Sequence, residues 1–244
     1  MPPRKATAKK LAEGYTWKKR ALEICSITCF WALWLWHFVA TARWYVHSGE
    51  VEPRHVTGIA AGFVVSALVA DFASGVAHWA LDTWGSTETP LFGSLIRSFR
   101  EHHVDQTAMT RHDFIETNGD NTLPLLPILA VARQFAVTSE SATAHSFVLC
   151  LAVWVAITNQ AHKWSHEVRP PALVCLAMRY RLLLDPQSHR VHHSGAHEKS
   201  YCITNGWLNP FLDAISFWRG AEMLVTALTG AVPRANDAQL LQGN

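Results

Sequence analysis

Histidines stand in closely spaced clusters in the second half of the sequence. His162 and His166 are four positions apart in "NQAHKWSHE". His189, His192 and His193 follow in "HRVHH", with spacings of three and four from the first ring. Residues at these spacings share one face of a helix, so each cluster can point two or more rings at one position. Because neutral imidazole is the commonest metal ligand in proteins, both clusters predict metal binding.

Further histidines earlier in the chain argue against a single structural zinc ion. His102 and His103 are adjacent in "FREHH", and His78 stands four residues before Asp82. The five cysteines are scattered without a C-x2-C pair, so a thiolate site is not expected. Imidazole suits iron, copper, zinc and nickel alike, and the rings outnumber the four ligands of structural zinc. We therefore expect two metals, and we favour a di-iron centre that reacts with O2. The predicted metal ligands are His78, His102, His103, His112, His162, His166, His189, His192, His193 and His197.

Apolar segments indicate the elements that must position these rings. A helix needs about 20 apolar residues to cross a bilayer, and residues 24–46, 57–81 and 145–161 approach or exceed that length. Residues 122–137 are shorter and contain two prolines, so they form a short, broken or interfacial helix. Residues 170–184 carry two arginines and predict an amphipathic helix on the membrane surface. The predicted fold is all-α: a polytopic membrane helix bundle of about four transmembrane helices with a cytosolic histidine-rich cap and amphipathic helices.

The charge distribution orients this bundle. Seven Lys and Arg in the first twenty residues place the N-terminus in the cytosol by the positive-inside bias. The net charge of +2 is too small to indicate nucleic acid as a partner. We divide the chain into a basic cytosolic tail (1–23), a membrane-embedded domain (24–234) and a polar C-terminal tail (235–244). Four crossings put both termini and the ten predicted ligands on the cytosolic side. The other four histidines lie in the half of the bundle away from the cytosol or in the loops beyond it: His37, His47, His55 and His145.

The motifs around the histidines resemble a known family. "GVAHWALDTWGS", "FREHHVDQTAMTRHDFIETNGDN", "NQAHKWSHE" and "HRVHHSGAHEKSYCITNGWLN" are similar to the lipid desaturase family, a group of fatty-acid-desaturase-like histidine-box membrane proteins. That family includes plasmanylethanolamine desaturases and a plastid palmitate desaturase. The likeness runs from about Asp71 to Arg234, and the second motif resembles the plasmanylethanolamine branch.

The resemblance implies a reaction and its partners. The reaction is conversion of a 1-O-alkyl chain to the 1'-2' vinyl ether of plasmalogens on a membrane ether phospholipid. It implies two iron ions as cofactor, O2 as oxidant, and electrons from cytochrome b5 with its NAD(P)H-dependent reductase. It also implies a multi-pass location in the endoplasmic reticulum membrane, with both termini cytosolic.

The resemblance leaves the role of one acidic residue open. The first box of acyl desaturases reads H-x3-H, whereas His78 and Asp82 here give H-x3-D, so Asp82 either binds iron or supports a ligand. Glu116, Asn118 and Asp120 are further candidates to support the site, since acidic or polar neighbours orient ligand rings through the second nitrogen. The Asn118–Gly119 pair also predicts a turn.

Two other functions remain open from the sequence. The same iron site could desaturate or hydroxylate an acyl chain of a phospholipid. Alternatively, the histidines could bind metal without catalysis in a membrane metal-binding protein.

Overall fold

The computed structural model describes residues 3–194 and 197–235. Over these residues the chain forms twelve α-helices and no β-strand, which confirms the predicted all-α class. Residues 236–244, which make up most of the predicted polar C-terminal tail, lie outside the described residues.

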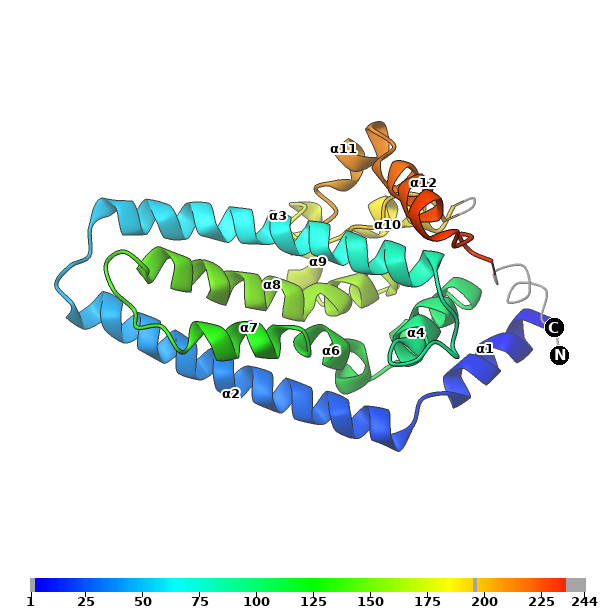
Figure 1. Ribbon diagram of the computed structural model, residues 1–244, viewed down its shortest axis with the longest axis horizontal. Coiled ribbons are helices and arrows are strands. Elements are labelled where there is room, and N and C mark those ends of the chain that lie inside the picture. The colour runs from blue at the N-terminus through cyan, green and yellow to red at the C-terminus, as the bar shows by residue number, and fades with distance from the viewer. Residues whose placement is uncertain (1–2, 195–196, 236–244) are drawn as a thin grey trace.

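Among the described residues, three helices are long and apolar enough to cross a membrane, and they form the body of the bundle. α2 (Trp17–His47), α3 (Pro53–Thr83) and α8 (Ala142–His166) extend along the long axis of the molecule (Figure 1). The side chain of Thr16 accepts a hydrogen bond from the first turn of α2, and a proline occupies the first position of α3. Proline is tolerated there because its missing N–H would have no partner within the helix. These helices confirm a membrane helical bundle.

Small residues let α3 and α8 approach each other closely. A Cβ atom on Gly58 would lie 2.6 Å from Cγ2 of Thr143, so a larger residue would clash there. Farther along the same pair, Ala67, Ala70 and Ala161 are buried in one cluster. Hydrophobic attraction between helices is weak in lipid, so this close van der Waals contact is what stabilises the pair.

Residues 122–137 form a broken helical segment, one of the forms expected there, so the described residues contain three long helices where about four crossings were predicted. The segment is divided between the end of α6 (Phe114–Thr122) and α7 (Leu125–Ala132). The break falls at Leu123 and Pro124, where proline cannot donate the next backbone hydrogen bond. α6 and α7 pack against α2 and α8 and carry the chain back along the bundle (Figure 1).

The N-terminal segment packs on the end of the bundle. α1 (Pro3–Glu13) contacts α4 (Gly93–Val104), which is followed by the short α5 (Ala108–Arg111). Leu11 is buried, and its carbonyl oxygen accepts a hydrogen bond of 3.0 Å from Nη1 of Arg97. Part of the sequence predicted as a tail therefore lies against a helix that carries two of the predicted ligands.

Four short helices complete the described chain after α8. They are α9 (Ala172–Arg179), α10 (Pro186–His192), α11 (Asn209–Ala214) and α12 (Phe217–Thr229). α9 buries Val174 and Met178 and exposes Leu173 and Leu176. This two-sided character is the one expected for the amphipathic segment at 170–184.

Asp71 of α3 holds the loop before α11. Its side chain is fully buried, and Oδ1 accepts hydrogen bonds from the backbone N–H of Asn205 (3.0 Å) and Gly206 (2.9 Å). Oδ2 accepts a third bond, of 3.1 Å, from the N–H of Leu208. An unpaired charge within a membrane helix is costly, and these charge-assisted bonds offset that cost.

Candidate metal centre

The helices that carry the predicted histidines meet at one end of the bundle. α4 and α10 lie beside the last turns of α3 and α8 there (Figure 1). Eight of the ten predicted ligands form two groups, in each of which the ligand nitrogens lie within 4.8 Å of one another. The first group is His102, His162, His166, His189 and His193, and the second is His78, His102, His103 and His192, so His102 is common to both.

The first group has the spacing of ligands around one metal. The Nε2 atoms of His162, His166 and His189 form a triangle with sides of 2.8, 3.0 and 3.3 Å. Nε2 of His193 lies 3.0 Å from that of His189. Two imidazole nitrogens that bind one metal at about 2.0–2.1 Å lie about 3.0–3.4 Å from each other when the N–metal–N angle is between a right angle and the tetrahedral angle. A hydrogen bond needs one protonated and one free nitrogen, so three mutually facing nitrogens cannot all be paired by hydrogen bonds alone. A shared cation resolves this conflict.

The second group includes a carboxylate. Oδ2 of Asp82 lies 3.1 Å from Nε2 of His78, 3.1 Å from Nε2 of His103 and 3.5 Å from Nε2 of His192. Despite this proximity, neither oxygen of Asp82 nor Nε2 of His78 has a hydrogen-bond partner among the described residues. Buried polar atoms are normally paired, so these orphaned atoms fit a bound cation. The geometry therefore favours Asp82 as a direct ligand over a supporting role.

Backbone carbonyls set the orientation of two rings in the second group. Nδ1 of His78 donates to the carbonyl oxygen of Tyr201 at 3.0 Å, and Nδ1 of His192 donates to that of Lys199 at 2.9 Å. In a neutral ring, a proton on Nδ1 leaves the lone pair on Nε2, which faces the group. This is the arrangement by which proteins commonly orient metal-binding histidines.

Burial and nearby rings favour the neutral form of four histidines outside the long helices. Burial lowers the pKa of His102 and His189 well below the ordinary value, and neighbouring histidines lower it further. Burial and nearby rings also lower the pKa of His192 and His193. Metals bind the neutral form of imidazole, so the donors present at neutral pH fit a metal.

Two predicted ligands lie outside both groups. The ring of His197 is 4.5 Å from that of His103, centroid to centroid, and burial lowers its pKa to about 4. Nε2 of His112 instead faces two carboxylates, 3.6 Å from Glu116 and 3.7 Å from Glu101. The structure therefore places His197 beside the second group and His112 in a separate ionic cluster.

Sequence reasoning missed the centre of that ionic cluster. Glu101 is buried and accepts a hydrogen bond of 2.8 Å from Nη1 of Arg97, one helical turn earlier. Burial raises the pKa of Glu101, but His112 and Arg97 more than offset this, and the net shift is downward. The i, i+4 spacing of an arginine and a glutamate just before His102 was the available signal.

The supporting residues predicted on α6 are dispersed around this cluster. Glu116 faces His112, and Nδ2 of Asn118 donates to Oε1 of Gln160 at 3.0 Å. Asp120 pairs with Lys19 of α2. A small cavity of about 30 Å³ connects this region to the first group, because His102, His162, Glu116 and Asp120 all line it. A cavity of this size is on the scale of a single water molecule.

The turn predicted at Asn118–Gly119 is wrong, because both residues lie within α6. Gly119 is needed for a different reason. A Cβ atom there would lie only 2.3 Å from Cβ of Glu23, so glycine allows α6 to touch α2. Local turn preference is overridden here by a helix–helix contact.

Histidines placed by sequence on the far side make structural contacts. Nδ1 of His145 lies 3.0 Å from Nε2 of His37. His55 accepts a hydrogen bond from the N–H of Glu52 and contacts the carbonyl oxygen of Ser139 at 2.8 Å. His37, His55 and His145 are all absent from the two groups.

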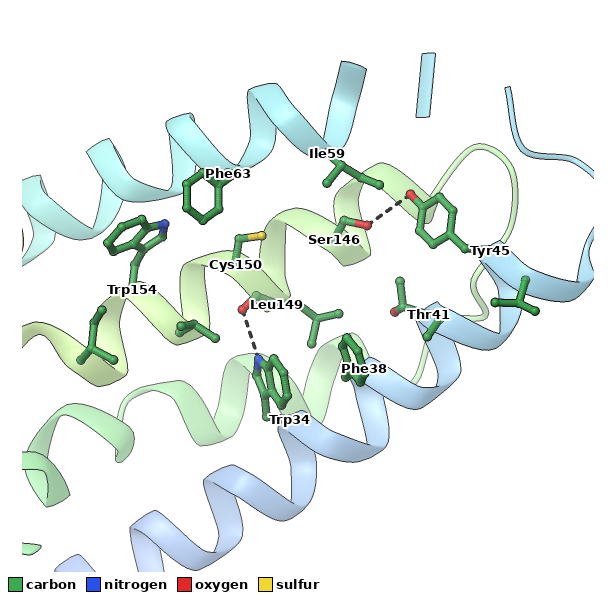
Figure 2. Close-up of a pocket in the computed structure, with 14 residues that line it drawn as sticks. Trp34, Phe38, Thr41, Tyr45, Ile59, Phe63, Ser146, Leu149, Cys150 and Trp154 are labelled. Atoms are coloured by element: carbon green, nitrogen blue, oxygen red, sulfur yellow. Dashed lines mark hydrogen bonds between the residues drawn. The ribbon is translucent and has the colours of Figure 1, made fainter. Parts of the chain in front are cut away.

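A larger cavity, of about 540 Å³, lies away from the histidines. Its walls are almost entirely apolar and come from α2, α3 and α8 (Figure 2). Trp34 donates through Nε1 to the carbonyl oxygen of Leu149 along one side. The last α8 residue in its lining is Ile157, and His162 is rotated from it by about 140° around the helix axis. The cavity therefore opens on a different face of α8 from the histidine groups.

Comparisons with known proteins agree with this site. The lipid desaturase domain matches residues 67–236. The chain is 46% identical to plasmanylethanolamine desaturase 1 of Mus musculus, over 97% of this chain and 88% of that protein. It is 43% identical to plasmanylethanolamine desaturase of Myxococcus xanthus, over 96% of this chain and 82% of that protein. Chloroplastic fatty acid desaturase 4 of Arabidopsis thaliana is 29% identical, over 69% of this chain and 52% of that protein. No solved structure matches the chain.

Proposed function

The chain belongs to the lipid desaturase domain family, and from this premise we propose that it is a plasmanylethanolamine desaturase. The observation that carries the proposal is the identity of 46% and 43%, over nearly the whole chain, to two proteins of that name. The substrate is a 1-O-alkyl phospholipid, which loses one hydrogen from C1′ and one from C2′ to give the vinyl ether. O2 takes up these two hydrogens, two electrons from a donor and two protons, and leaves as two waters.

Two iron ions form the proposed cofactor. His162, His166, His189 and His193 would hold one, while His78, Asp82, His103 and His192 would hold the other, and His102 belongs to both groups of facing nitrogens. When bound, the iron pair supplies the reactivity toward O2 that breaks an unactivated C–H bond.

The chain's own residues protect and orient this centre. Imidazole and carboxylate resist oxidation, whereas a thiolate ligand would itself be oxidised, and no cysteine belongs to either group. The carbonyl oxygens of Lys199 and Tyr201 hold two rings in the metal-binding tautomer. Burial of His78, His162, His189 and His192 excludes bulk water from the site.

The proposal includes an electron donor and a location. Cytochrome b5 with its NAD(P)H-dependent reductase would supply the two electrons at the cytosolic face. The chain would lie in the endoplasmic reticulum membrane with both termini cytosolic. The excess of Lys and Arg in the first twenty residues supports this orientation.

Lipid analysis tests the function directly. The full chain is expressed in cells that lack plasmanylethanolamine desaturase activity and are supplied with an alkyl-glycerol precursor. We expect vinyl-ether phosphatidylethanolamine to accumulate with the wild-type chain and not with the His166→Ala variant at matched expression.

The other functions predict different outcomes in the same cells. A new double bond or hydroxyl on an acyl chain, without vinyl ether, would favour the acyl-chain reaction, for which the 29% identical fatty acid desaturase is the support. No lipid product, together with stoichiometric zinc and no iron in the purified protein, would favour a non-catalytic metal-binding protein.

A further inference from the structure

A polar cavity of about 390 Å³ lies between the end of α9, α10 and α11. Asp185 and Ser188 line it from the start of α10, and Ser200, Asn205 and others line it from the loop before α11. Its volume falls at the small end of the roughly 300–1,000 Å³ range that holds small ligands. None of the residues assigned to iron lines it.

Charges of both signs line this cavity. Arg181 lies on one side, and the carboxylates of Asp185 and Asp213 also line it. In the part of the chain that the structure describes, no salt bridge joins Arg181 to a carboxylate. Asn205 is buried, and its Nδ2 has no hydrogen-bond partner among those residues. The cavity therefore offers a cation and an amide donor beside a pair of acidic groups.

Large apolar side chains at and beside the lining residues are exposed. Trp207 lines the cavity, and Tyr180, Leu182 and Phe211 are chain neighbours of lining residues. Tyr180, Leu182, Trp207 and Phe211 expose 68%, 47%, 37% and 62% of their surface. Trp207 is held in place because its Nε1 donates to the backbone oxygen of Arg181 at 2.5 Å. Exposed aromatic and aliphatic side chains of this kind suit the headgroup level of a bilayer, where indole and phenol rings concentrate.

We propose that this cavity binds the phosphoethanolamine headgroup of a membrane phospholipid, with the phosphate on Arg181 and the ammonium on Asp185 and Asp213. The proposal rests on the proposed function, because it assigns the headgroup of that reaction's substrate to a place on the chain. A guanidinium matches phosphate through paired N–H donors. A primary ammonium has three N–H donors for the two carboxylates, whereas a choline headgroup has none.

The position of the cavity relative to the histidines suits such a substrate. Ser188 and Val191 line the cavity, and their chain neighbours His189 and His192 belong to the two metal groups. Ser200 also lines it, between the two residues whose carbonyl oxygens orient His78 and His192. The cavity and the metal groups therefore share the short helix α10. Only a few covalent bonds separate the phosphate of a phospholipid from C1′ of its ether chain.

Equilibrium binding to the purified full chain in detergent tests the proposal. The probes are short-chain 1-O-alkyl-2-acyl lipids with a phosphoethanolamine headgroup, a phosphocholine headgroup, or only the glycerol hydroxyl. We expect Arg181→Gln to weaken binding of the phosphoethanolamine lipid about tenfold and to leave the glycerol lipid unchanged. Arg181→Lys should restore part of the affinity, because it keeps the charge but not the paired donors.

Arg190→Gln is the matched control, because Arg190 is exposed on α10 and does not line the cavity. It should bind all three lipids as the wild type does. Unchanged phosphoethanolamine affinity in Arg181→Gln, or equal loss for all three lipids, would overturn the proposal. Binding needs no turnover, so it separates the two hypotheses: absence of vinyl ether with the headgroup preference intact contradicts only the reaction.

Discussion

Oδ2 of Asp82 lies 3.1 Å from Nε2 of His103, although the two residues come from different helices. Asp82 lies in the last turn of α3 and His103 in the last turn of α4, so the contact forms only when these helices pack. His78 lies one turn before Asp82 and also contacts it. The contact with His103 therefore joins the H-x3-D motif of α3 to a histidine of α4.

Asp82→Asn should reduce iron from about two per chain to about one and lower desaturation by about 100-fold or more, because the amide lacks the negative charge with which a carboxylate binds a metal cation. Iron is measured by mass spectrometry of the purified protein. Asp120→Asn is the control, since Asp120 pairs with Lys19 and belongs to neither group. Two irons and full activity in Asp82→Asn would refute the ligand assignment.

His166→Ala and His192→Ala should each abolish activity while expression stays near the wild-type level. Each variant removes a ligand from a different group. Activity and iron content are compared with those of His55→Gln, which changes a histidine bonded to Ser139 at the far end. We expect His55→Gln to keep its iron; equal iron loss in all three would contradict the distinction between ligand and structural histidines.

His112→Gln should keep both irons. Its ring faces Glu101 and Glu116, not the histidine groups, so the change disturbs an ionic cluster. Activity should fall, but by less than in His166→Ala. Loss of one iron in His112→Gln would instead restore the ligand role that the sequence alone suggested.

Removal of iron by a chelator should lower the Tm of the wild-type chain. When the free metal concentration is about a thousand times its Kd, binding stabilises the folded state by about 4 kcal/mol. Loss of the metal also leaves the lone pairs of facing nitrogens buried together. Thermal unfolding followed by intrinsic tryptophan fluorescence measures the shift. The double variant His166→Ala, His192→Ala should show no further shift with chelator, and an equal shift there would point to a nonspecific effect.

Asp71→Asn should lower Tm by about 5–10 °C, since it weakens three charge-assisted hydrogen bonds to the loop before α11. Ser74→Ala is the comparison, because it removes a single bond to the same loop, from the N–H of Ile203. We expect a smaller shift there. Equal stability of Asp71→Asn and wild type would show that the loop is held by other contacts.

Much of the architecture followed from sequence patterns alone. Apolar length predicted α2, α3 and α8, and the i, i+4 spacing predicted that His162 and His166 share a face. These are local properties: helix periodicity and the thickness of a bilayer act on each segment separately. The same reasoning failed at Gly119, where contact with Glu23 outweighs the local preference for a turn.

The sequence by itself determined the helical membrane class, the family and the set of histidines predicted to bind metal. Only the tertiary structure decided how that set divides. In the tertiary structure Asp82 lies next to His103, and the carbonyl oxygen of Lys199 orients His192. His112 lies beside Glu101, apart from both histidine groups. The physical reason is that ligand geometry depends on atoms from α3, α4, α8 and α10 meeting within a few ångströms, and no spacing within one helix specifies that meeting.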